Sequence, residues 1–224
     1  MIIIGITGTI GAGKGTIVEL LIKKGFKHYS VRDFLVEEIK KRGLEINRDT
    51  MTSTANSLRE EFGNDYIVKT ILNTAIANGD DCVIESIRND KEIELLRNIH
   101  NFYLFSVDAD IKTRYQRISL RKSATDNVSF ETFVENEKRE MQSDNNNSQN
   151  IAICMQKADY TFNNDQDVES LSKQVEDVLK QMEKFKRPSW DEYFMNLANA
   201  AAKRATCDRG RSGCVIVKDK QVLV

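Results

Sequence analysis

The chain has 224 residues, of which 40% are hydrophobic and 30% charged, so it can bury one good core and part of a second. Its 33 Lys and Arg nearly balance 34 Asp and Glu, and this balance excludes a general attraction to DNA, RNA or an anionic membrane. The N-terminal apolar run is too short to span a membrane and has no basic stretch before it, so we expect a cytoplasmic protein.

The first predicted elements are a strand over residues 1–6 and a glycine-rich loop that opens into a helix. The loop matches the phosphate-binding pattern G-x-x-x-x-G-K-[ST] through Lys14, but Gly15 stands at the next position and Thr16 follows. Backbone N–H groups, a mobile ammonium group and a hydroxyl for Mg²⁺ together suit a polyphosphate. We therefore predict a phosphate site that contains Gly8, Gly11, Ala12, Gly13, Lys14, Gly15 and Thr16.

The next segments alternate between strand and helix patterns. We predict a helix over 17–24, a strand over 26–30, a helix over 31–42 and two further helices over 51–62 and 65–78. The strand–helix–strand order predicts an α/β fold with a parallel sheet and helices on both faces.

A short apolar strand over 81–85 ends in the carboxylate of Glu85. Beside a phosphate loop, such a carboxylate is a candidate second-shell ligand of Mg²⁺; the alternative is a solvated side chain at a strand end. Asn89, with Glu92 three residues later, predicts a helix start, and 102–107 predicts another buried strand.

Three arginines recur on one face of the helix predicted over 110–121, namely Arg114, Arg117 and Arg121. Such a stripe suits a polyphosphate, whereas the alternative is a solvated basic face balanced by nearby acids. The polar segment 123–129 predicts the tip of a lid. The helix expected over 130–141 adds Arg139 to the candidate nucleotide-binding residues.

The remainder of this domain, which we place at residues 1–183, begins with a polar loop at 143–150. A helix over 151–157, a strand over 160–162 and a helix over 168–182 follow. Residues 163–165 lie between the last strand and helix, where they either form an adenine-facing loop or cap the helix, and Asn163 is the candidate nucleotide-binding residue among them.

The composition changes near 184–188, which holds the single proline, and we place a second region at 188–224. Residues 189–192 form a capping box before a helix with an apolar face, and 214–217 and 222–224 flank a turn. This region therefore predicts one helix and the start of a hairpin.

Four cysteines (Cys82, Cys154, Cys207 and Cys214) form no C-x-x-C pair, and two histidines (His28 and His100) lie far apart. A zinc site needs three or four clustered ligands of these types, so we expect none in this chain.

Residues 1 to about 182 resemble P-loop nucleoside and nucleotide kinases, especially archaeal dephospho-CoA-kinase-like ATPases. The phosphate loop, the 83–88 strand end, the arginine helix and the segments 130–140 and 158–160 carry this resemblance. It implies Mg²⁺-ATP as ligand or substrate, with Lys14 and Glu85 in catalysis, although many such kinases have Asp where Glu85 stands. It also implies Asp33 as a candidate base and three acceptor-phosphate contacts, Arg32, Arg59 and Arg88.

The tail resembles the opening helix and first strand of deoxycytidylate deaminases, in the strings 187–195, 201–204, 206–207 and 213–218. The resemblance implies a full-length parent that deaminates dCMP or dCTP with zinc, in nucleotide metabolism or phage defence, and forms a homo-oligomer through that domain. Zinc in that family needs an H-x-E and a P-C-x-x-C motif. Neither occurs here, so we expect no deamination by this chain.

Two functions follow for the first domain. In one, it is a nucleotide-binding sensor that responds to ATP or a deoxynucleotide and controls the deaminase of the parent. In the alternative, it is a Mg²⁺-ATP-dependent nucleotide or dephospho-CoA-like kinase that transfers the γ-phosphate to a small acceptor.

Overall fold

The computed structural model describes residues 1–121, 128–141, 149–185, 190–206 and 210–223. The chain divides into two compact units, residues 1–178 and 179–224, each of which is described by itself. Several predicted features lie partly or wholly outside the described residues: the lid tip, the polar loop after 142, the composition change at 184–188, the capping-box residue Ser189, Cys207, and the last residue of the segment predicted over 222–224.

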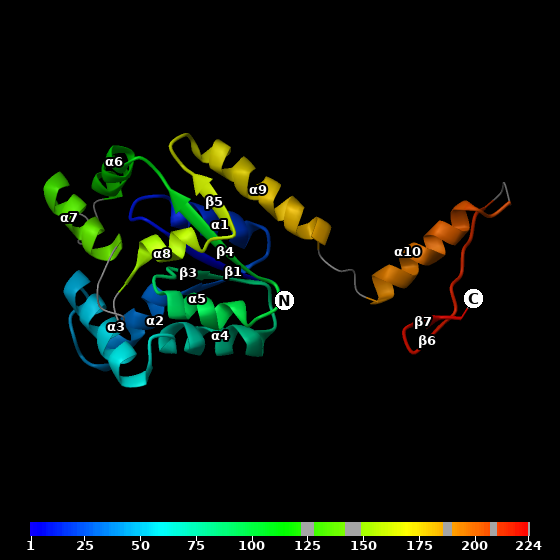
Figure 1. The fold of residues 1–224 in the computed structure, drawn as a ribbon, viewed down its shortest axis with the longest axis horizontal. Helices are drawn as coiled ribbons and strands as arrows, with labels where there is room; N and C mark the ends of the chain where they lie inside the picture. The colour runs from blue at the N-terminus through cyan, green and yellow to red at the C-terminus, as the bar shows by residue number, and fades with distance from the viewer. Residues whose placement is uncertain (122–127, 142–148, 186–189, 207–209, 224) are drawn as a thin grey trace. The chain divides into compact units, whose positions relative to one another are not determined.

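The first unit is built on a five-stranded sheet in the order β2-β3-β1-β4-β5 (Figure 1). Every neighbouring pair is parallel. The strands are β1 (Ile3–Gly8), β2 (Lys27–Ser30), β3 (Cys82–Glu85), β4 (Phe102–Asp108) and β5 (Tyr160–Asn163). The predicted α/β fold with a parallel sheet is confirmed.

Strand register brings the predicted site to one edge of the sheet. Ile6 of β1 lies opposite Glu85 of β3, and Gly8 lies opposite Val107 of β4. Because all strands are parallel, their carboxyl ends meet at the same edge, where α/β proteins bind ligands. The central strand β1 is buried along its whole length, as a strand covered on both faces must be.

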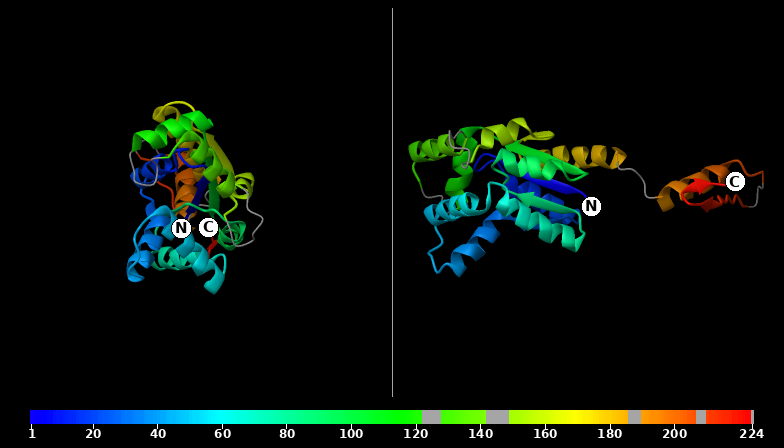
Figure 2. Two further views of the ribbon diagram at one scale, coloured as in Figure 1. Left: turned by 90° about the vertical axis from the view of Figure 1, so that its left-hand side faces the viewer. Right: turned by 60° about the horizontal axis from the view of Figure 1, so that its bottom comes forward.

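Helices cover both faces of this sheet, with α4 and α5 on one side and α9 on the other (Figures 1 and 2). Residues from α2, α3, α4, α5 and α8 share one hydrophobic cluster with alternate residues of the strands. The helices of the first unit are α1 (Lys14–Lys23), α2 (Val31–Lys41), α3 (Arg48–Phe62), α4 (Tyr66–Asn78), α5 (Asp90–Arg97), α6 (Ile111–Arg121), α7 (Phe130–Met141), α8 (Ile151–Gln156) and α9 (Val168–Phe185), the last of which runs on into the second unit.

Some boundaries differ from those predicted. Helix α1 begins at Lys14 rather than at residue 17, because the loop glycines turn directly into the first helical turn. Helix α3 begins at Arg48 rather than at residue 51, since Asn47 and Thr50 form a capping box. The predicted box of Asn89 and Glu92 is present at the start of α5.

The second unit carries α10 (Trp190–Lys203) and a hairpin of β6 (Val217–Lys218) and β7 (Gln221–Val222). The strands are shorter than predicted, with two paired residues each. No residue of α10 is buried, although the ring of Trp190 stacks on Phe194 with centroids 5.5 Å apart. The backbone at Gly213 lies so close to Ala198 that a side chain could not fit between them.

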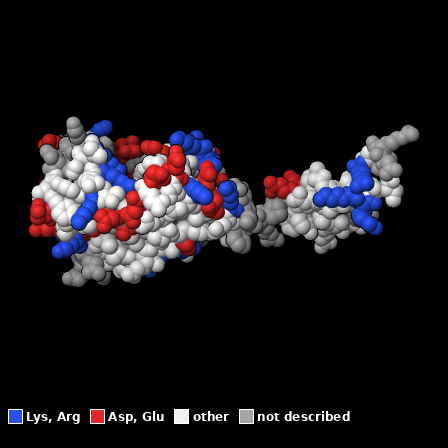
Figure 3. Space-filling model, turned by 90° about the horizontal axis from the view of Figure 1, so that it is seen from above, with Lys and Arg blue, Asp and Glu red and all other residues white. Residues whose placement is uncertain are grey.

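Acidic and basic side chains are interspersed on the face of the first unit seen in Figure 3, in keeping with the near-zero net charge. No helix among the described residues is long and apolar enough to cross a membrane.

Candidate phosphate-binding site

The glycine-rich loop, residues 8–16, connects the end of β1 to α1 in an irregular turn. Gly8, Gly11 and Gly13 have φ angles of 138°, 79° and 106°, which L side chains rarely adopt. A Cβ on Gly8 would collide with the carbonyl oxygen of Val107 in β4. The glycines are therefore required here by both the turn and the close approach of neighbouring backbone.

The carbonyl groups of this loop are held by other groups. Lys14 Nζ donates to the carbonyl oxygens of Gly8 and Thr9, 2.8 Å away in each case. Among the described residues, none accepts a hydrogen bond from the backbone N–H of Gly11, Gly13, Lys14 or Gly15. A concave turn with engaged carbonyls and free N–H groups suits an anion.

Lys14 is placed among charges of both signs. The pKa of Lys14 is lowered to about 7, chiefly because burial removes its ammonium group from water and also because Arg88 and Arg121 lie nearby, whereas Glu85 and Glu140 act in the opposite direction. Two predicted site residues from β3 and α6 thus lie within electrostatic reach of the loop lysine. An anion bound here would stabilise the charged form of Lys14.

The candidate metal ligands stand at this edge too. Thr16 lies in the first turn of α1, and its N–H donates to the carbonyl oxygen of Gly13. Glu85 ends β3, and its Oε2 lies 3.1 Å from Nε2 of His28 in β2. No group of three His, Cys, Asp or Glu side chains within the described residues could hold a metal ion alone. The donors present fit Mg²⁺, which takes few protein oxygens and completes its shell with phosphates and water.

The predicted stripe of three arginines does not form one exposed face. Arg114 is 4% exposed and is paired with Glu137 of α7. It also donates to the carbonyl oxygens of Ala109 and Ile10, at 2.7 and 3.3 Å. The prediction that all three arginines share one surface is wrong, because the first of them turns inward between the loop and α7.

The other predicted phosphate contacts of the lid are more accessible. Arg117 is half-buried and its Nη2 donates weakly to the carbonyl of Gln166, at 3.4 Å. Arg121 and Arg139 are exposed at the ends of α6 and α7. Of these three, Arg121 is the one within electrostatic reach of Lys14.

Two of the predicted acceptor residues, Arg59 and Arg88, differ in how far they are open to solvent. Arg59 and Glu92 form an ion pair at 3.2 Å with side chains 3% and 1% exposed, so Arg59 does not face an open site. Arg88 donates to Glu140 and Gln149, at 3.1 and 2.7 Å, and stays partly open.

The two remaining acceptor candidates lie at the start of α2. Arg32 and Asp33 are exposed there, and the Asp33 N–H donates to Ser30 Oγ.

Two adjacent asparagines, the last residue of β5 and the residue that follows it, have different hydrogen-bond partners. The side chain of Asn163 donates to Asp165, at 2.7 Å, and its backbone pairs with Gln174. Asn164 is 6% exposed, and its Nδ2 donates to the carbonyl oxygen of Ala12, at 2.8 Å. The neighbour of the predicted residue is therefore the one that contacts the phosphate loop.

Sequence reasoning missed several residues around this site, namely His28, Asp108, Glu137 and Glu140, and it included Asn164 only as a member of the loop at 163–165. Asp108, at the end of β4, accepts a 2.6 Å hydrogen bond from Thr9 Oγ1. Asp108 follows a buried strand, the next strand in the chain after the one that ends at Glu85, and this pattern could have identified it from the sequence. Glu137 and Glu140, the partners of Arg114 and Arg88, carried no such signal.

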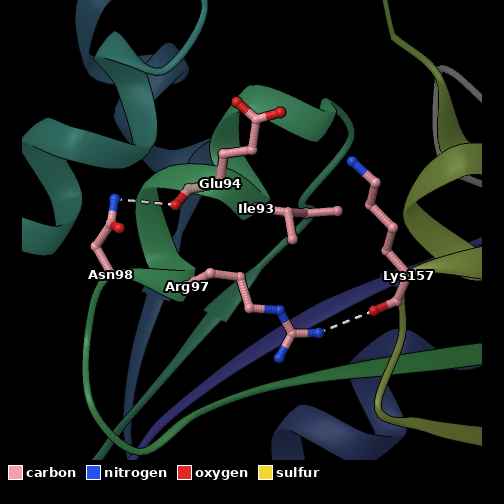
Figure 4. Close-up of a pocket in the computed structure, with 5 residues that line it drawn as sticks. All are labelled: Ile93, Glu94, Arg97, Asn98 and Lys157. Atoms are coloured by element: carbon pink, nitrogen blue, oxygen red, sulfur yellow. Dashed lines mark hydrogen bonds between the residues drawn. The ribbon is translucent and has the colours of Figure 1, made fainter.

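A shallow depression of about 520 Å³ lies elsewhere in the first unit, between the end of α5 and the segment before β5 (Figure 4). It is lined by Ile93, Glu94, Arg97, Asn98 and Lys157. Arg97 is held by Asp159 and by the carbonyl oxygen of Lys157. Because α5 ends where β4 begins, this depression is at the amino-terminal edge of the sheet, away from the phosphate loop.

The parallel sheet, the glycine-rich loop after its first strand and the helix that follows define a P-loop kinase-like protein. The chain belongs to the AAA domain family, whose match covers residues 4–143, and to the UPF0200 proteins. UPF0200 protein MJ1399 of Methanocaldococcus jannaschii is 31% identical over 194 residues, which cover 84% of this chain and 95% of that protein. A UPF0200 protein of Methanothermobacter thermautotrophicus is 30% identical over 81% of this chain and 91% of the relative.

Solved structures show the same fold at low sequence identity. TT1252 from Thermus thermophilus has a TM-score of 0.56 at 20% identity, covering 80% of this chain and 97% of that one. A shikimate kinase from Bacteroides thetaiotaomicron has a TM-score of 0.53 at 16% identity, over 81% and 98% of the two chains. A dephospho-CoA kinase from Campylobacter jejuni reaches 0.50 at 14% identity, over 83% and 98%.

These comparisons show a P-loop kinase-like fold for the first unit. Both the family match and the kinase neighbours concern the P-loop fold. None of them supports a deaminase, a zinc site or oligomer formation through a deaminase domain.

Proposed function

We propose that the chain is a Mg²⁺-ATP-dependent phosphotransferase that moves the γ-phosphate to a small acceptor with an anionic group. One observation carries this proposal: the free N–H groups of the phosphate loop and the Lys14 ammonium converge beside Arg88, Arg121 and Glu85 at one edge of the sheet. Phosphoryl transfer requires little covalent chemistry from the protein, and positioning with charge stabilisation provides most of the catalysis.

The loop and its lysine hold the donor. The N–H groups of Gly11, Gly13, Lys14 and Gly15 would cradle the phosphates, while Lys14 exchanges its two carbonyl acceptors for β- and γ-phosphate oxygens. Mg²⁺, when bound, neutralises phosphate charge, and Thr16 with Glu85 would hold it. Arg117, Arg121 and Arg139 are the proposed lid contacts to the triphosphate.

The acceptor half uses the other open groups at this edge. Arg88 lies close enough to Lys14 to alter the Lys14 pKa, so an anion held by Arg88 would stand near the γ-phosphate. Asp33 and Arg32 are exposed on the first turn of α2, where Asp33 is the proposed base for an acceptor hydroxyl. Arg59 is not a direct contact of the acceptor in this proposal. It pairs with Glu92, which also accepts a hydrogen bond from the backbone N–H of Arg88.

Product analysis tests the proposal. The full chain is incubated with Mg²⁺ and ATP labelled at the γ-phosphate, together with a panel of nucleosides, nucleotides and dephospho-CoA, and products are identified by mass spectrometry. We expect label in one acceptor class, and no transfer by Lys14→Ala. Binding of ATP without any labelled product would instead favour a sensor.

The sensor is the second candidate, and the tail's residue pattern is what favours it. The strings 187–195 and 213–218 resemble a deoxycytidylate deaminase, and a domain fused to such an enzyme would respond to ATP or a deoxynucleotide without transferring phosphate. The zinc, the dCMP or dCTP substrate and the oligomer belong to the proposed full-length parent. A test is whether a longer protein that carries both zinc motifs deaminates dCMP at a rate that depends on ATP.

A further inference from the structure

The segment 163–167 joins β5 to α9 and touches both the phosphate loop and the start of α6. Its Asp165 accepts a hydrogen bond from the N–H of Asp110, just before α6, at 2.5 Å. The backbone N–H of Asn164 donates to the carbonyl oxygen of Asp108 at the end of β4, at 2.8 Å. These bonds fix the segment at the carboxyl edge of the sheet and turn the side chain of Asn164 toward the phosphate loop.

We propose that Asn164 is a positioning residue that aims the N–H of Gly13 at a bound phosphate. Its Nδ2 donates to the carbonyl oxygen of Ala12 at 2.8 Å in a buried contact. The carbonyl of Ala12 and the N–H of Gly13 belong to one planar trans peptide group, so they point in opposite directions. A carbonyl held toward Asn164 therefore directs the Gly13 N–H away from it, into the concave side of the loop.

The glycine at position 13 fits this arrangement. Its φ of 106° places the backbone in a conformation that L side chains rarely adopt, and a Cβ there would collide with Nδ2 of Asn164. The amide of Asn164 thus occupies the volume next to Gly13 and leaves the opposite side of the peptide for the ligand. A free peptide group would rotate among several orientations, and anion binding would have to order it.

Arg114 shows that the same arrangement recurs two residues earlier in the loop. Its Nη1 donates to the carbonyl oxygen of Ile10, and the N–H of Gly11 belongs to that peptide group. Arg114 has further partners in Glu137, Asp108 and Ala109, so its replacement would disturb several elements. Asn164 is the cleaner probe, because within the described part of the chain its side chain hydrogen-bonds to the Ala12 carbonyl alone.

The test measures binding of inorganic tripolyphosphate, which has no base, to the full chain by calorimetry. Asn164→Ala should weaken binding about tenfold, equal to about 1.4 kcal/mol. Asn164→Asp keeps the size of the side chain but places an acceptor against the Ala12 carbonyl, so it should lose at least as much. This inference rests on the proposed function only in requiring that the loop binds phosphates.

Asp167→Ala is the matched control from the same segment. Asp167 Oδ1 accepts from the N–H of Ser170 at the start of α9, so its loss destabilises a helix end without touching the phosphate loop. We expect a lowered melting temperature with unchanged tripolyphosphate affinity. Titrations are run well below the melting temperature of each variant.

The outcomes separate this inference from the proposed function. Failure of the wild-type chain to bind tripolyphosphate or ATP would overturn both. Wild-type binding with equal affinity in both Asn164 variants would overturn the positioning role alone. A loss for ATP without a loss for tripolyphosphate would show that Asn164 contacts the base, which also contradicts the proposal. If Asn164→Ala does not fold, the Asp variant decides.

Discussion

The phosphate loop and the tail are both glycine-containing segments beside a helix, but the loop is packed among distant segments and the tail is exposed. Residues 8–13 are buried or half-buried, and their carbonyl groups are held by side chains from α1, α6 and the segment after β5. In the tail, α10 has no buried residue and the hairpin pairs two residues on each strand. Local sequence patterns form helices and turns in both places, but only burial and long-range hydrogen bonds fix their geometry.

A second difference concerns charge. The first unit buries charged side chains in pairs from different helices, such as Arg59 with Glu92 and Arg114 with Glu137. The charged side chains that the structure describes in the tail are exposed. Buried pairs make a region sensitive to single substitutions, because removal of one partner leaves an uncompensated charge. Substitutions in each region, with effects of expected size, can test this difference in burial.

The largest effect is expected for Glu92→Ala in α5. It leaves the 3% exposed guanidinium of Arg59 without its carboxylate, and it removes the acceptor for the N–H groups of Arg88 and Asn89. We expect the free energy of unfolding to fall by about 3–5 kcal/mol in urea titrations. The double variant Arg59→Met with Glu92→Leu, which buries no charge, should recover much of this loss. Equal losses in the single and double variants would contradict the charge explanation.

The next largest effect is expected for Lys14→Ala on Mg²⁺-ATP binding. Lys14 is the loop's own charged donor to the β- and γ-phosphates, and charge-assisted hydrogen bonds contribute about 1.5–3 kcal/mol. The dissociation constant measured by calorimetry should rise about tenfold or more. Lys24→Ala, which removes an exposed ion pair with Glu176, serves as the control and should leave affinity unchanged. Equal affinity of Lys14→Ala and wild type would contradict the phosphate site.

The sequence predicts the fold well because the fold follows from short patterns. Glycines at 8, 11 and 13, the apolar strands and the alternation of strand and helix required no knowledge of distant contacts. The phosphate loop was predicted for the same reason. What the pattern could not give is the direction of individual side chains once distant segments meet.

Arg114 and Asn164 show this limit. Helical spacing places Arg114 on the same stripe as Arg117, but Glu137, which lies 23 residues later, draws it into the interior. Asn163 and Asn164 are adjacent and chemically identical, so only the bond from Asn164 N–H to the Asp108 carbonyl decides which side chain reaches the loop. Such choices depend on the packed sheet and not on local propensity.

A moderate effect on ATP affinity is expected for Arg117→Ala. It tests whether Arg117, unlike the buried Arg114, contacts the nucleotide. Arg117 is half-buried beside the segment after β5. In its proposed lid role it contacts the outer phosphates of a triphosphate, which a monophosphate lacks. Affinity should fall about three- to tenfold for ATP, the effect of one charged hydrogen bond near a surface, and little for AMP. Titrations with both nucleotides check this. A small effect of equal size on both nucleotides, or no effect, would favour a solvated basic face.

The smallest effect is expected in the tail, for Ile216→Ala. Ile216 is 54% exposed, so truncation removes little buried surface, and the free energy of unfolding of the first unit should change by less than about 0.5 kcal/mol. The matched control is Ile84→Ala in β3, where the side chain is fully buried and the same truncation should cost about 2–5 kcal/mol. Both are measured in urea by the signal of the first unit. A cost above about 1 kcal/mol for Ile216→Ala would mean that the tail unfolds together with the first unit. The exposed Ile216 would then be covered by other groups in solution, and the contrast between the two regions would not hold.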